Sequence, residues 1–390
     1  MKRKHLIALF LLVQFIACYY YSTKKGMEKG KVDEVIVRVR LIFAREGIGL
    51  KAKKGLIILT EGKKRGVDSD KEVKLYWGKK GLTVKINEQT LLETNDTVYL
   101  QSEGLIQVGE RFYRGEVRAF VSPESGLIVI NRLRVREYLY GVIPCEIGPI
   151  NERTFEAVKA QVIVARSFAL SRLGRRKGLG YDLYDSYLRD QEYRGAGYES
   201  ELSNRAVEET AGEVLTWEGE VAEALYHCCC GGRTAQGSRS YLIPVFDTPG
   251  HKSGTNPFCA QSPHFSWKVT IPRDSVEKVL ARLKRLKEQP RVRTFKLIRD
   301  EKSKRVKSLW FKTDKGELKV SGEDFRFALG LKSQMFDMKI TKSKVLFTGK
   351  GWGHGIGLCQ DGAVAMARRG YNYHQILNHY YPLLKIRRLN

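Results

Sequence analysis

The residue with the clearest chemical potential is a carboxylic acid in the run Pro144-Cys145-Glu146-Ile147-Gly148-Pro149. Glu146 lies between two prolines, ahead of a helix and in an apolar context. Partial burial would raise its pKa and keep it protonated near neutrality, as a general acid requires. A helix-entry glutamate with a purely structural hydrogen bond fits the position as well. From position alone, that second reading is the stronger one.

A second stretch, Tyr226 to Thr234, joins a histidine to three cysteines and two glycines. Gly231 and Gly232 would let the backbone approach a ligand closely or adopt a positive φ. His227 could be a ligand, a base or a packed histidine. Without further context the packed role is favoured.

The third stretch has glycine at every second position from Gly349 to Gly357. In an extended chain this spacing leaves one face bare and places Trp352 and His354 on the other. A bare face beside an indole would suit a sugar, whereas a tight crossing of two strands requires the same glycines. The run is not a phosphate loop, because the chain has no G-x-x-x-x-G-K-[ST] pattern.

The chain contains seven cysteines, and setting Cys18 aside leaves an even number, which is compatible with disulfides in an exported protein. Their spacing matches no standard zinc signature, so we expect no cofactor. Zinc stays open as an alternative, with His227, Cys230, His354 and Cys359 as its ligands.

Charge restricts the partners that the chain can have. Lysine and arginine number 69 against 43 acids, a formal net charge of +26. Such an excess favours nucleic acid, an anionic membrane or an acidic cell wall. The basic residues are spread along the chain rather than gathered in one arm, so we expect no nucleic-acid partner.

The N-terminus has the pattern of an export signal. Lys2-Arg3-Lys4-His5 is basic, and the apolar run Leu6 to Ala17 is shorter than the ~20 residues that span a bilayer. Phe15-Ile16-Ala17-Cys18 resembles a bacterial lipobox. Residues 1–21 are therefore a cleaved signal, a lipoprotein anchor or an uncleaved membrane anchor. All three readings place the rest of the chain in the cell envelope or outside the cell, with membrane contact through this segment alone.

The remaining chain mixes strands and helices without regular alternation, which predicts an α+β fold. We expect a β-rich part over 32–130, a catalytic core over 131–267 and 345–390, and a smaller inserted α+β unit over 268–344. Alternating runs at Val35–Leu41, Leu82–Ile86 and Val117–Val121 indicate strands. The predicted helices are Arg136–Ile143 (halted at Pro144), Thr154–Leu173, Ser203–Ala211, Ser275–Leu286, Gly322–Leu329 and Gly362–Arg369.

Taken together, the three stretches resemble the SpoIID/LytB domain family, that of the stage II sporulation protein D. The resemblance runs from about Val32 to the C-terminus. The matching segments are Tyr113-Arg114-Gly115, Val129 to Leu133, Tyr138 to Glu146, Glu156 to Ser167, Asp190 to Gly195, Tyr226 to Thr234, Ser262 to Trp267 and Gly351 to Ala363.

This resemblance implies a peptidoglycan lytic transglycosylase built around a glycan-binding cleft. Such enzymes cut the β-1,4 bond from N-acetylmuramic acid to N-acetylglucosamine, preferably in glycan whose peptides an amidase has removed. The muramic 6-hydroxyl attacks its own anomeric carbon and leaves a 1,6-anhydro end. One carboxylic acid then suffices where ordinary glycosidases use two. Glu146 falls on the catalytic glutamate of the family.

The resemblance also implies a substrate-binding set. Its members are Lys159, Gln161, Arg166, Tyr226, His227, Gly231, Gly232, Trp352, His354 and Gln360. Lys159 and Arg166, seven residues apart, would share a helix face, with surface solvation as the alternative. Cysteines stand at 228–230 and 359 where many relatives have serine, and we expect a disulfide from one of Cys228–Cys230 to Cys259 or Cys359.

Two other functions stay open. The LytB branch implies a non-catalytic protein that binds glycan and stimulates a cell-wall amidase. A secreted polyanion-binding protein would also explain the charge, and it would show steep salt dependence and no product.

Overall fold

The computed structural model describes residues 32–41, 47–60, 62–78 and 80–389. The predicted signal or anchor at 1–21, including Cys18, lies outside the described residues. Within them, no helix has both the length and the apolar content needed to span a membrane. Contacts divide the chain into two compact units. The first comprises the described parts of Met1–Ile150, Ala165–Glu223 and Ile386–Asn390, and the second comprises Asn151–Val164 and Ala224–Lys385.

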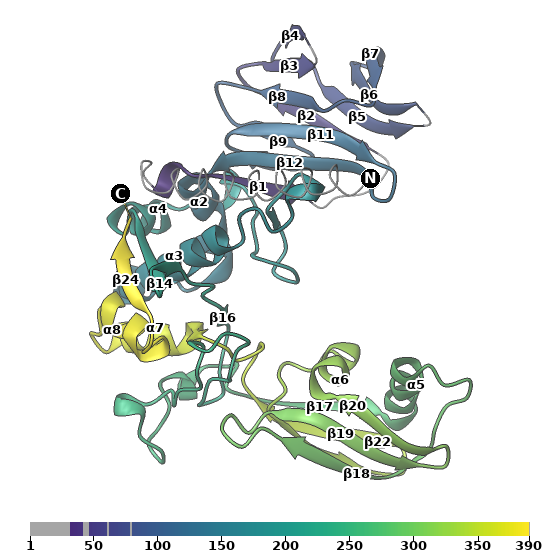
Figure 1. Ribbon diagram of the computed structural model, residues 1–390, viewed down its shortest axis with the longest axis vertical. Coiled ribbons are helices and arrows are strands. Elements are labelled where there is room, and N and C mark those ends of the chain that lie inside the picture. The colour runs from purple at the N-terminus through teal and green to yellow at the C-terminus, as the bar shows by residue number, and fades with distance from the viewer. Residues whose placement is uncertain (1–31, 42–46, 61, 79, 390) are drawn as a thin grey trace, which may run out of the picture. The chain divides into compact units, whose positions relative to one another are not determined.

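The first unit contains two large sheets of mostly antiparallel strands (Figure 1). One has the order β13 (Leu183–Tyr184), β1 (Ile36–Leu41), β12 (Gly126–Arg134), β11 (Glu116–Ser122), β8 (Val98–Gln101), β3 (Leu56–Thr60), β4 (Lys63–Val67). The other has the order β10 (Arg111–Tyr113), β9 (Ile106–Val108), β2 (Gly47–Ala52), β5 (Val73–Gly78), β6 (Gly81–Ile86), β7 (Gln89–Thr94).

Burial along these strands follows their sequence patterns. In β1 the valines are buried and the intervening arginines are partly exposed, the alternation of a strand with one face toward the core. In β12 nearly all residues are buried, including polar Asn131 at the middle of the strand. This central strand leads directly into the first helix of the unit, so the sheet fixes where that helix begins.

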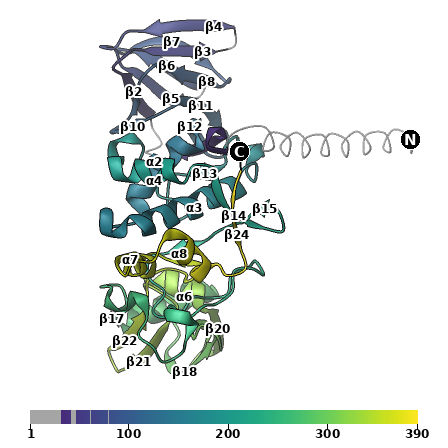
Figure 2. The same cartoon turned by 90° about the vertical axis from the view of Figure 1, so that its left-hand side faces the viewer.

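Three helices complete the first unit: α2 (Val135–Glu146), the C-terminal part of α3 (Phe155–Ser171) and α4 (Glu201–Glu209). Figure 2 shows α2 and α4 side by side. A small sheet of β15 (Glu220–Val221), β14 (Glu213–Trp217) and β24 (Lys385–Arg388) lies at the C-terminus.

The second unit has its own hydrophobic core over residues 267–347. Two antiparallel sheets form it: β17 (Ser266–Pro272), β22 (Lys344–Lys350), β21 (Phe336–Ile340), and β18 (Val292–Arg299), β19 (Val306–Thr313), β20 (Gly316–Ser321). Helices α5 (Arg273–Lys284) and α6 (Gly322–Leu329) pack on them (Figure 1). The interior of this core consists mainly of Val276, Leu280, Phe311, Phe325 and Phe347.

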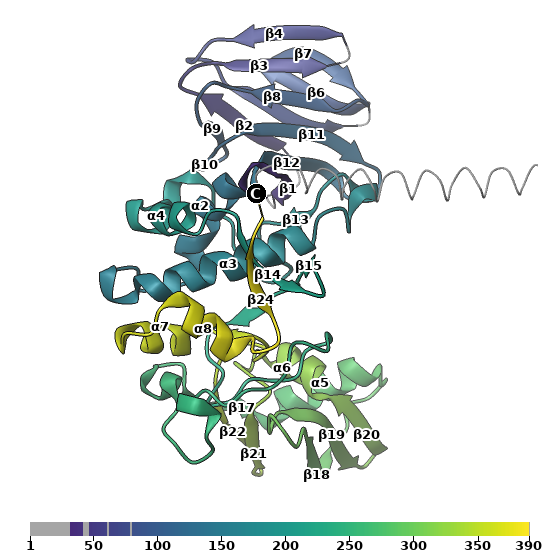
Figure 3. The same cartoon turned by 60° about the vertical axis from the view of Figure 1, so that its left-hand side comes forward.

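The rest of the second unit has less regular structure. The strands β16 (Tyr226–His227) and β23 (Leu358–Cys359) pair in parallel, and α7 (Gln360–Arg368) follows directly. Figure 3 shows α7 beside α8 (Tyr373–Tyr380). Between β16 and β17 the chain is mostly loop, held by isolated bridges such as Cys229 to Trp352.

The mixed α+β class is confirmed, as are the predicted strands and most of the helices. One helix end was wrong, because α2 continues through Pro144 to Glu146. Proline removes the bond that its own N–H would make and crowds the preceding turn. The final turn is nevertheless closed by the Ile147 N–H, which donates to the Ile143 carbonyl at 3.2 Å. Helix α8 was missed.

Candidate functional site

Glu146 occupies the last position of α2 in the first unit and is half-buried. Its side-chain Oε1 accepts a hydrogen bond from the backbone N–H of Glu192 at 2.6 Å. A backbone amide is a fixed donor, so this hydrogen bond orients the carboxyl group. The candidate acid is therefore held by a residue 46 positions away in the sequence.

The segment that supplies this amide, Asp190–Gly195, packs directly against α2. The Arg194 N–H donates to the Gly141 carbonyl at 3.3 Å, and the ring of Tyr193 lies 5.0 Å from that of Tyr138. A Cβ on Gly141 would lie 2.6 Å from the Tyr193 ring and 3.0 Å from the Gly195 carbonyl oxygen. Glycine at 141 is thus a condition for the close approach that brings the Glu192 amide to Glu146.

Tyr193 ties the same segment to the sheet. Its hydroxyl donates to Asn131 Oδ1 at 2.7 Å, and Asn131 Nδ2 donates to the Arg114 carbonyl at 2.8 Å. Both side chains are buried, and burial raises the pKa of Tyr193 well above its usual value. Tyr193 therefore acts as a neutral hydrogen-bond donor. This network was not predicted as part of the site, although its segment belonged to the resemblance.

Two other carboxylates of this segment are engaged in ion pairs. Glu192 Oε1 lies 2.8 Å from Arg194 Nε, and buried Asp190 lies 3.0 Å from Arg176 Nη1. A paired carboxylate is a weaker base than a lone one because its charge is already stabilised. Glu146, in contrast, accepts a hydrogen bond from an uncharged backbone amide.

The prediction that Arg166 binds the sugar substrate was wrong. Its side chain is fully buried in the first unit, where Nε contacts Asp33 at 2.9 Å and Nη1 donates to the Thr210 and Glu213 carbonyls. Nη2 donates to the Val207 carbonyl at 3.1 Å. A guanidinium used in this way holds protein segments together and presents no donor to a sugar.

Three other predicted ligands belong to the second unit, and two of them are in contact. Buried Gln161 accepts from Gln360 Nε2 at 3.5 Å, while its own Nε2 has no protein partner. Lys159 pairs with Glu156 at 2.6 Å and lies over the ring of Tyr373 at 4.9 Å. The structure thus brings Gln161 and Gln360 into contact, and it places Lys159 in a separate charged and aromatic setting.

His227 and His354 are both neutral, packed histidines. Their rings lie 5.5 Å apart. Burial lowers the pKa of His227 far below its usual value and that of His354 to about 4. His227 Nδ1 lies 3.1 Å from the Ile356 carbonyl oxygen, and Tyr226 pairs with Leu358 across β16 and β23. The packed reading of His227 agrees with these contacts.

The glycine run does not form the expected bare face. Gly351, Gly353, Gly355 and Gly357 all have positive φ, so the segment is not extended. A Cβ would lie 2.6 Å from the Cys229 carbonyl oxygen at Gly351 and 2.8 Å from His227 Cβ at Gly353. At Gly231 it would lie 2.9 Å from Lys350, so this glycine also permits a chain crossing.

Trp352 is the part of this stretch that is available to a ligand. Its indole is 42 % exposed, and it lies 4.6 Å from Lys332 Nζ and 4.9 Å from the ring of His264. A partly exposed aromatic beside polar groups is a common sugar-binding feature, because the apolar face of a sugar ring packs on the indole.

Gly232 was also predicted to contact substrate. It has a φ of +105°, and a Cβ there would lie 3.2 Å from Pro257.

Next to Trp352 lies a half-buried group of Cys228, His264 and Asp361. Cys228 Sγ and Asp361 Oδ2 lie 3.0 and 3.1 Å from the same atom, His264 Nδ1. A nucleophilic relay needs the thiol and the carboxylate on opposite nitrogens. Burial and Asp361 raise the pKa of the Cys228 thiol to about 12. This group is therefore not arranged as a cysteine nucleophile.

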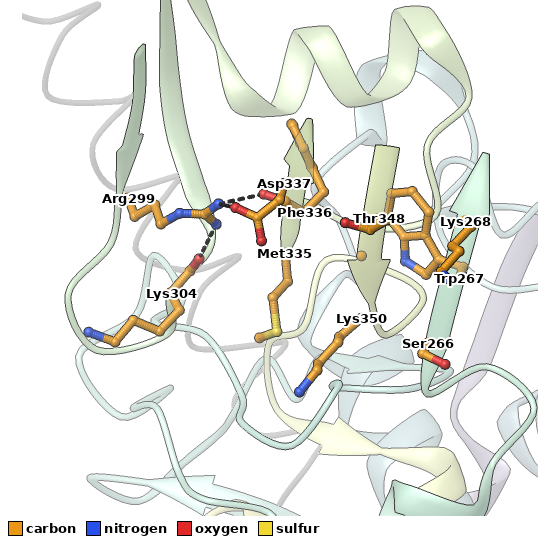
Figure 4. Close-up of a pocket in the computed structure, with 11 residues that line it drawn as sticks. Ser266, Trp267, Lys268, Arg299, Lys304, Met335, Phe336, Asp337, Thr348 and Lys350 are labelled. Carbon is orange, nitrogen blue, oxygen red and sulfur yellow. Dashed lines mark hydrogen bonds and ion pairs between the residues drawn. The ribbon is translucent and has the colours of Figure 1, made fainter. Parts of the chain in front are cut away.

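A hollow of about 720 Å³ opens at β17, β22 and β21 (Figure 4). Lys268, Arg299, Lys304 and Lys350 line it, with Asp337 as its carboxylate. Figure 4 shows Arg299 directed at Asp337, with which it pairs. None of the residues predicted for the site is among those that line this hollow.

Comparison with known proteins confirms the resemblance. Residues 123–217 match the family model described as SpoIID, Stage II sporulation protein, and residues 239–357 match a domain of unknown function, DUF8618. The first match contains α2, α4 and the segment that holds Glu146. The second contains Cys259, His264 and the whole glycine run from Gly349 to Gly357.

Several curated relatives are about a quarter identical to this chain over the residues that align. An uncharacterized protein of Brachyspira hyodysenteriae (strain ATCC 49526 / WA1) is 27% identical over 304 residues, 77% of this chain and 78% of the relative. Stage II sporulation protein D of Bacillus subtilis (strain 168) is 26% identical over 268 residues, 65% of this chain and 74% of the relative. The Amidase enhancer of the same strain is 28% identical over 292 residues, 63% of this chain and 39% of the relative.

Proposed function

We propose that this chain, whose residues 123–217 match the SpoIID family model, is an exported lytic transglycosylase of bacterial cell-wall glycan, with Glu146 as its acid and base. The observation that carries the proposal is the 2.6 Å hydrogen bond from the Glu192 N–H to Glu146 Oε1. The amide fixes one oxygen and thereby decides which oxygen carries the proton.

In the acid form, Oε1 is the carbonyl oxygen that accepts the amide, and Oε2 carries the proton. That proton passes to the glycosidic oxygen as the bond to N-acetylmuramic acid breaks. The 6-hydroxyl of the same muramic residue then bonds to its anomeric carbon and gives its proton to Oε2. No water enters, Glu146 is regenerated, and the product has a 1,6-anhydro end.

This course needs one carboxylic acid rather than the two of a hydrolase. The ion pairs of Glu192 and Asp190 support it, because those carboxylates are charge-compensated and poorly suited to activate a water. The net charge of +26 supports a polyanionic wall as the setting. Trp352 is the aromatic surface that we assign to a sugar ring in the second unit.

The test is to incubate the protein with peptide-free glycan strands and to identify the ends by mass spectrometry. The wild type is expected to release anhydro-muramic ends, and Glu146→Gln is expected to release none. Unchanged release by Glu146→Gln would remove Glu146 from the mechanism.

The second candidate is a glycan-binding protein that stimulates a cell-wall amidase, and the similarity to a relative named Amidase enhancer favours it. It predicts binding to glycan without new ends and faster peptide release by an added amidase. Glu146→Gln would leave that stimulation unchanged, so the same variant separates the two functions.

A further inference from the structure

Four cysteines of the second unit meet at one buried point. Cys229, Cys230, Cys259 and Cys359 are each at most 1 % exposed. They arrive from three separate segments: the loop after β16, the short 3₁₀ helix Phe258–Gln261, and the residue that precedes α7. Nothing in the proposed transglycosylase reaction uses them, so their convergence requires its own explanation.

The separations fit ligands of a single metal ion. The Sγ atoms of Cys230 and Cys259 are 3.6 Å apart. Zinc–sulfur bonds of about 2.3 Å in a tetrahedron place sulfur atoms about 3.8 Å apart. A disulfide would require about 2.05 Å, and all of these cysteines are free thiols. The disulfide predicted from one of Cys228–Cys230 to Cys259 or Cys359 is therefore not formed, although these cysteines do lie together.

The donor atoms of three cysteines and one carboxylate form the tightest set. Cys230, Cys259 and Cys359 lie with Asp247 so that all four donor atoms are within 4.8 Å of one another. Both oxygens of Asp247 are already engaged, since Oδ1 accepts from the Tyr380 hydroxyl at 2.6 Å and Oδ2 from the Cys259 N–H at 2.9 Å. Asp247 is therefore better placed to hold Cys259 than to bind an ion.

Cys229 is the remaining thiol. Its side chain interacts with those of Cys259 and Cys359, two members of the same set. With Cys229 included, every ligand is a thiolate, the donor type that closed zinc sites use most. His227 and His354 are absent from this set among the described residues, which corrects the ligand group expected from the sequence.

Backbone amides point at the sulfur atoms. Cys359 Sγ accepts from the Cys230 N–H at 3.2 Å and the Gly362 N–H at 3.4 Å, and Cys230 Sγ accepts from the Gly232 N–H at 3.3 Å. Amide donors stabilise a negative sulfur and orient it, as outer partners of metal ligands do. Arg305, 4 % exposed, adds a cation nearby and donates to the Cys230 carbonyl at 2.8 Å.

We propose that Cys229, Cys230, Cys259 and Cys359 bind one zinc ion in a closed, structural site. On binding, four thiols release four protons and form four zinc–sulfur bonds, and no oxidation is involved. The ion joins three segments of a loop-rich region, and one of its ligands, Cys229, pairs through its backbone with Trp352. Asp247 orients Cys259 from outside the ligand set.

The direct test is the metal content of the full chain, purified without chelator and measured by plasma mass spectrometry. We expect about one zinc per chain in the wild type and in Cys145→Ser, and a loss of at least tenfold in Cys259→Ser and Cys359→Ser. Cys145 is a matched control because its thiol lies in the first unit and outside the set. A wild-type protein that contains no zinc would overturn the proposed site. Zinc retained by both Cys259→Ser and Cys359→Ser would overturn it as well.

Two measurements remove the risk that a variant merely fails to fold. In the wild type, a mercurial thiol reagent should release the zinc in step with thiol modification. A count of free thiols after denaturation without reductant should find all six cysteines of the described residues reduced, including the four of the set. A disulfide among those four, located by peptide mapping, would refute the proposal.

Cobalt substitution identifies the fourth ligand. Cobalt bound by four thiolates gives an intense sulfur-to-metal charge-transfer band and tetrahedral d–d bands. Cys229→Ser should weaken and shift these bands, whereas Asp247→Asn should leave their pattern intact. The reverse result would contradict the assignment of Cys229.

Discussion

The backbone N–H of Glu192 donates to the carboxyl Oε1 of Glu146 at 2.6 Å, across 46 residues of sequence. The donor belongs to a segment whose own carboxylate is paired with Arg194. A fixed amide and a compensated neighbour leave Glu146 as the group that we assign to proton transfer. Four predictions concern Glu146, the glycine that lets the neighbouring segment approach it, buried Arg166, and the histidines His354 and His379 of the second unit.

Replacing Glu146 by glutamine should abolish cutting without unfolding the protein. Glutamine keeps an oxygen that can accept the Glu192 amide, but it cannot carry the proton, and loss of a general acid costs about 10²–10⁴ in rate. The rate of release of anhydro ends measures this. Glu192→Gln is the matched control, because it keeps the N–H and removes the charge of a partly exposed ion pair. An equal loss of rate in both variants would argue that cutting depends on the Glu192 side chain rather than on its backbone amide.

Replacing Gly141 by alanine should destabilise the first unit and lower activity together. Alanine is the better helix former by about 1 kcal/mol, but its Cβ would lie 2.6 Å from the ring of buried Tyr193. Overpacking of this kind costs about 1–3 kcal/mol and displaces the segment that holds Glu146. Urea unfolding and product release are the measurements.

Gly197→Ala is the control for this change. A Cβ at Gly197 meets nothing within 4 Å, so its free energy of unfolding should change by less than about 0.5 kcal/mol. If Gly141→Ala were equally neutral, the close approach of Tyr193 to α2 would not be needed for the site.

Replacing Arg166 by methionine should act on stability rather than on sugar binding. The change leaves Asp33 and three backbone carbonyls without their buried partner, a loss of about 3–5 kcal/mol. Arg205→Gln, which touches a largely exposed pair with Glu209, should cost about 0.5 kcal/mol or less. A stable Arg166→Met protein with weakened glycan binding would restore the ligand role that we reject.

Stability should fall as the pH drops below neutrality. Burial lowers the pKa of His354 from 6.5 to about 4, so its folded form binds a proton less readily than its unfolded form. This contribution is complete above pH 6.5 and is lost as the pH falls toward 4. The slope is at most about 1.4 kcal/mol per pH unit for each such histidine.

Urea unfolding across this pH window measures the effect. His379 adds to it in the same direction, because burial and His251 lower its pKa to about 4. His354→Asn should reduce the slope. A free energy of unfolding that is flat over this range would contradict the buried, neutral state of these histidines.

The sequence pattern was enough to predict an element where buried residues recur at the spacing of a strand or a helix. The alternation in β1 and the long apolar stripe of α3 were predicted from sequence, and α6 matches its predicted range. The glycine run was misinterpreted because a bare strand face and a crowded chain crossing demand the same residue. Only the neighbours of Gly351 and Gly353 distinguish them.

Contacts between residues that are far apart in the sequence leave no comparable pattern in the sequence. Arg166 meets Asp33, 133 residues earlier, and nothing in α3 itself shows whether its arginine is exposed or buried. The Glu192 amide that holds Glu146 is a backbone group, which any residue type supplies. The thiol set is assembled from three segments whose spacing matches no zinc signature. The resemblance of the sequence was enough to propose Glu146 as the acid, but it could not predict the contacts that hold this side chain.

The central claim is that Glu146 makes an intramolecular cut that consumes no water. Digestion of peptide-free glycan strands in ¹⁸O-labelled water, followed by mass spectrometry of the new ends, tests it most directly. We predict anhydro-muramic ends that carry no ¹⁸O, and no new ends with Glu146→Gln. Reducing muramic ends that carry ¹⁸O would show hydrolysis and would contradict the account.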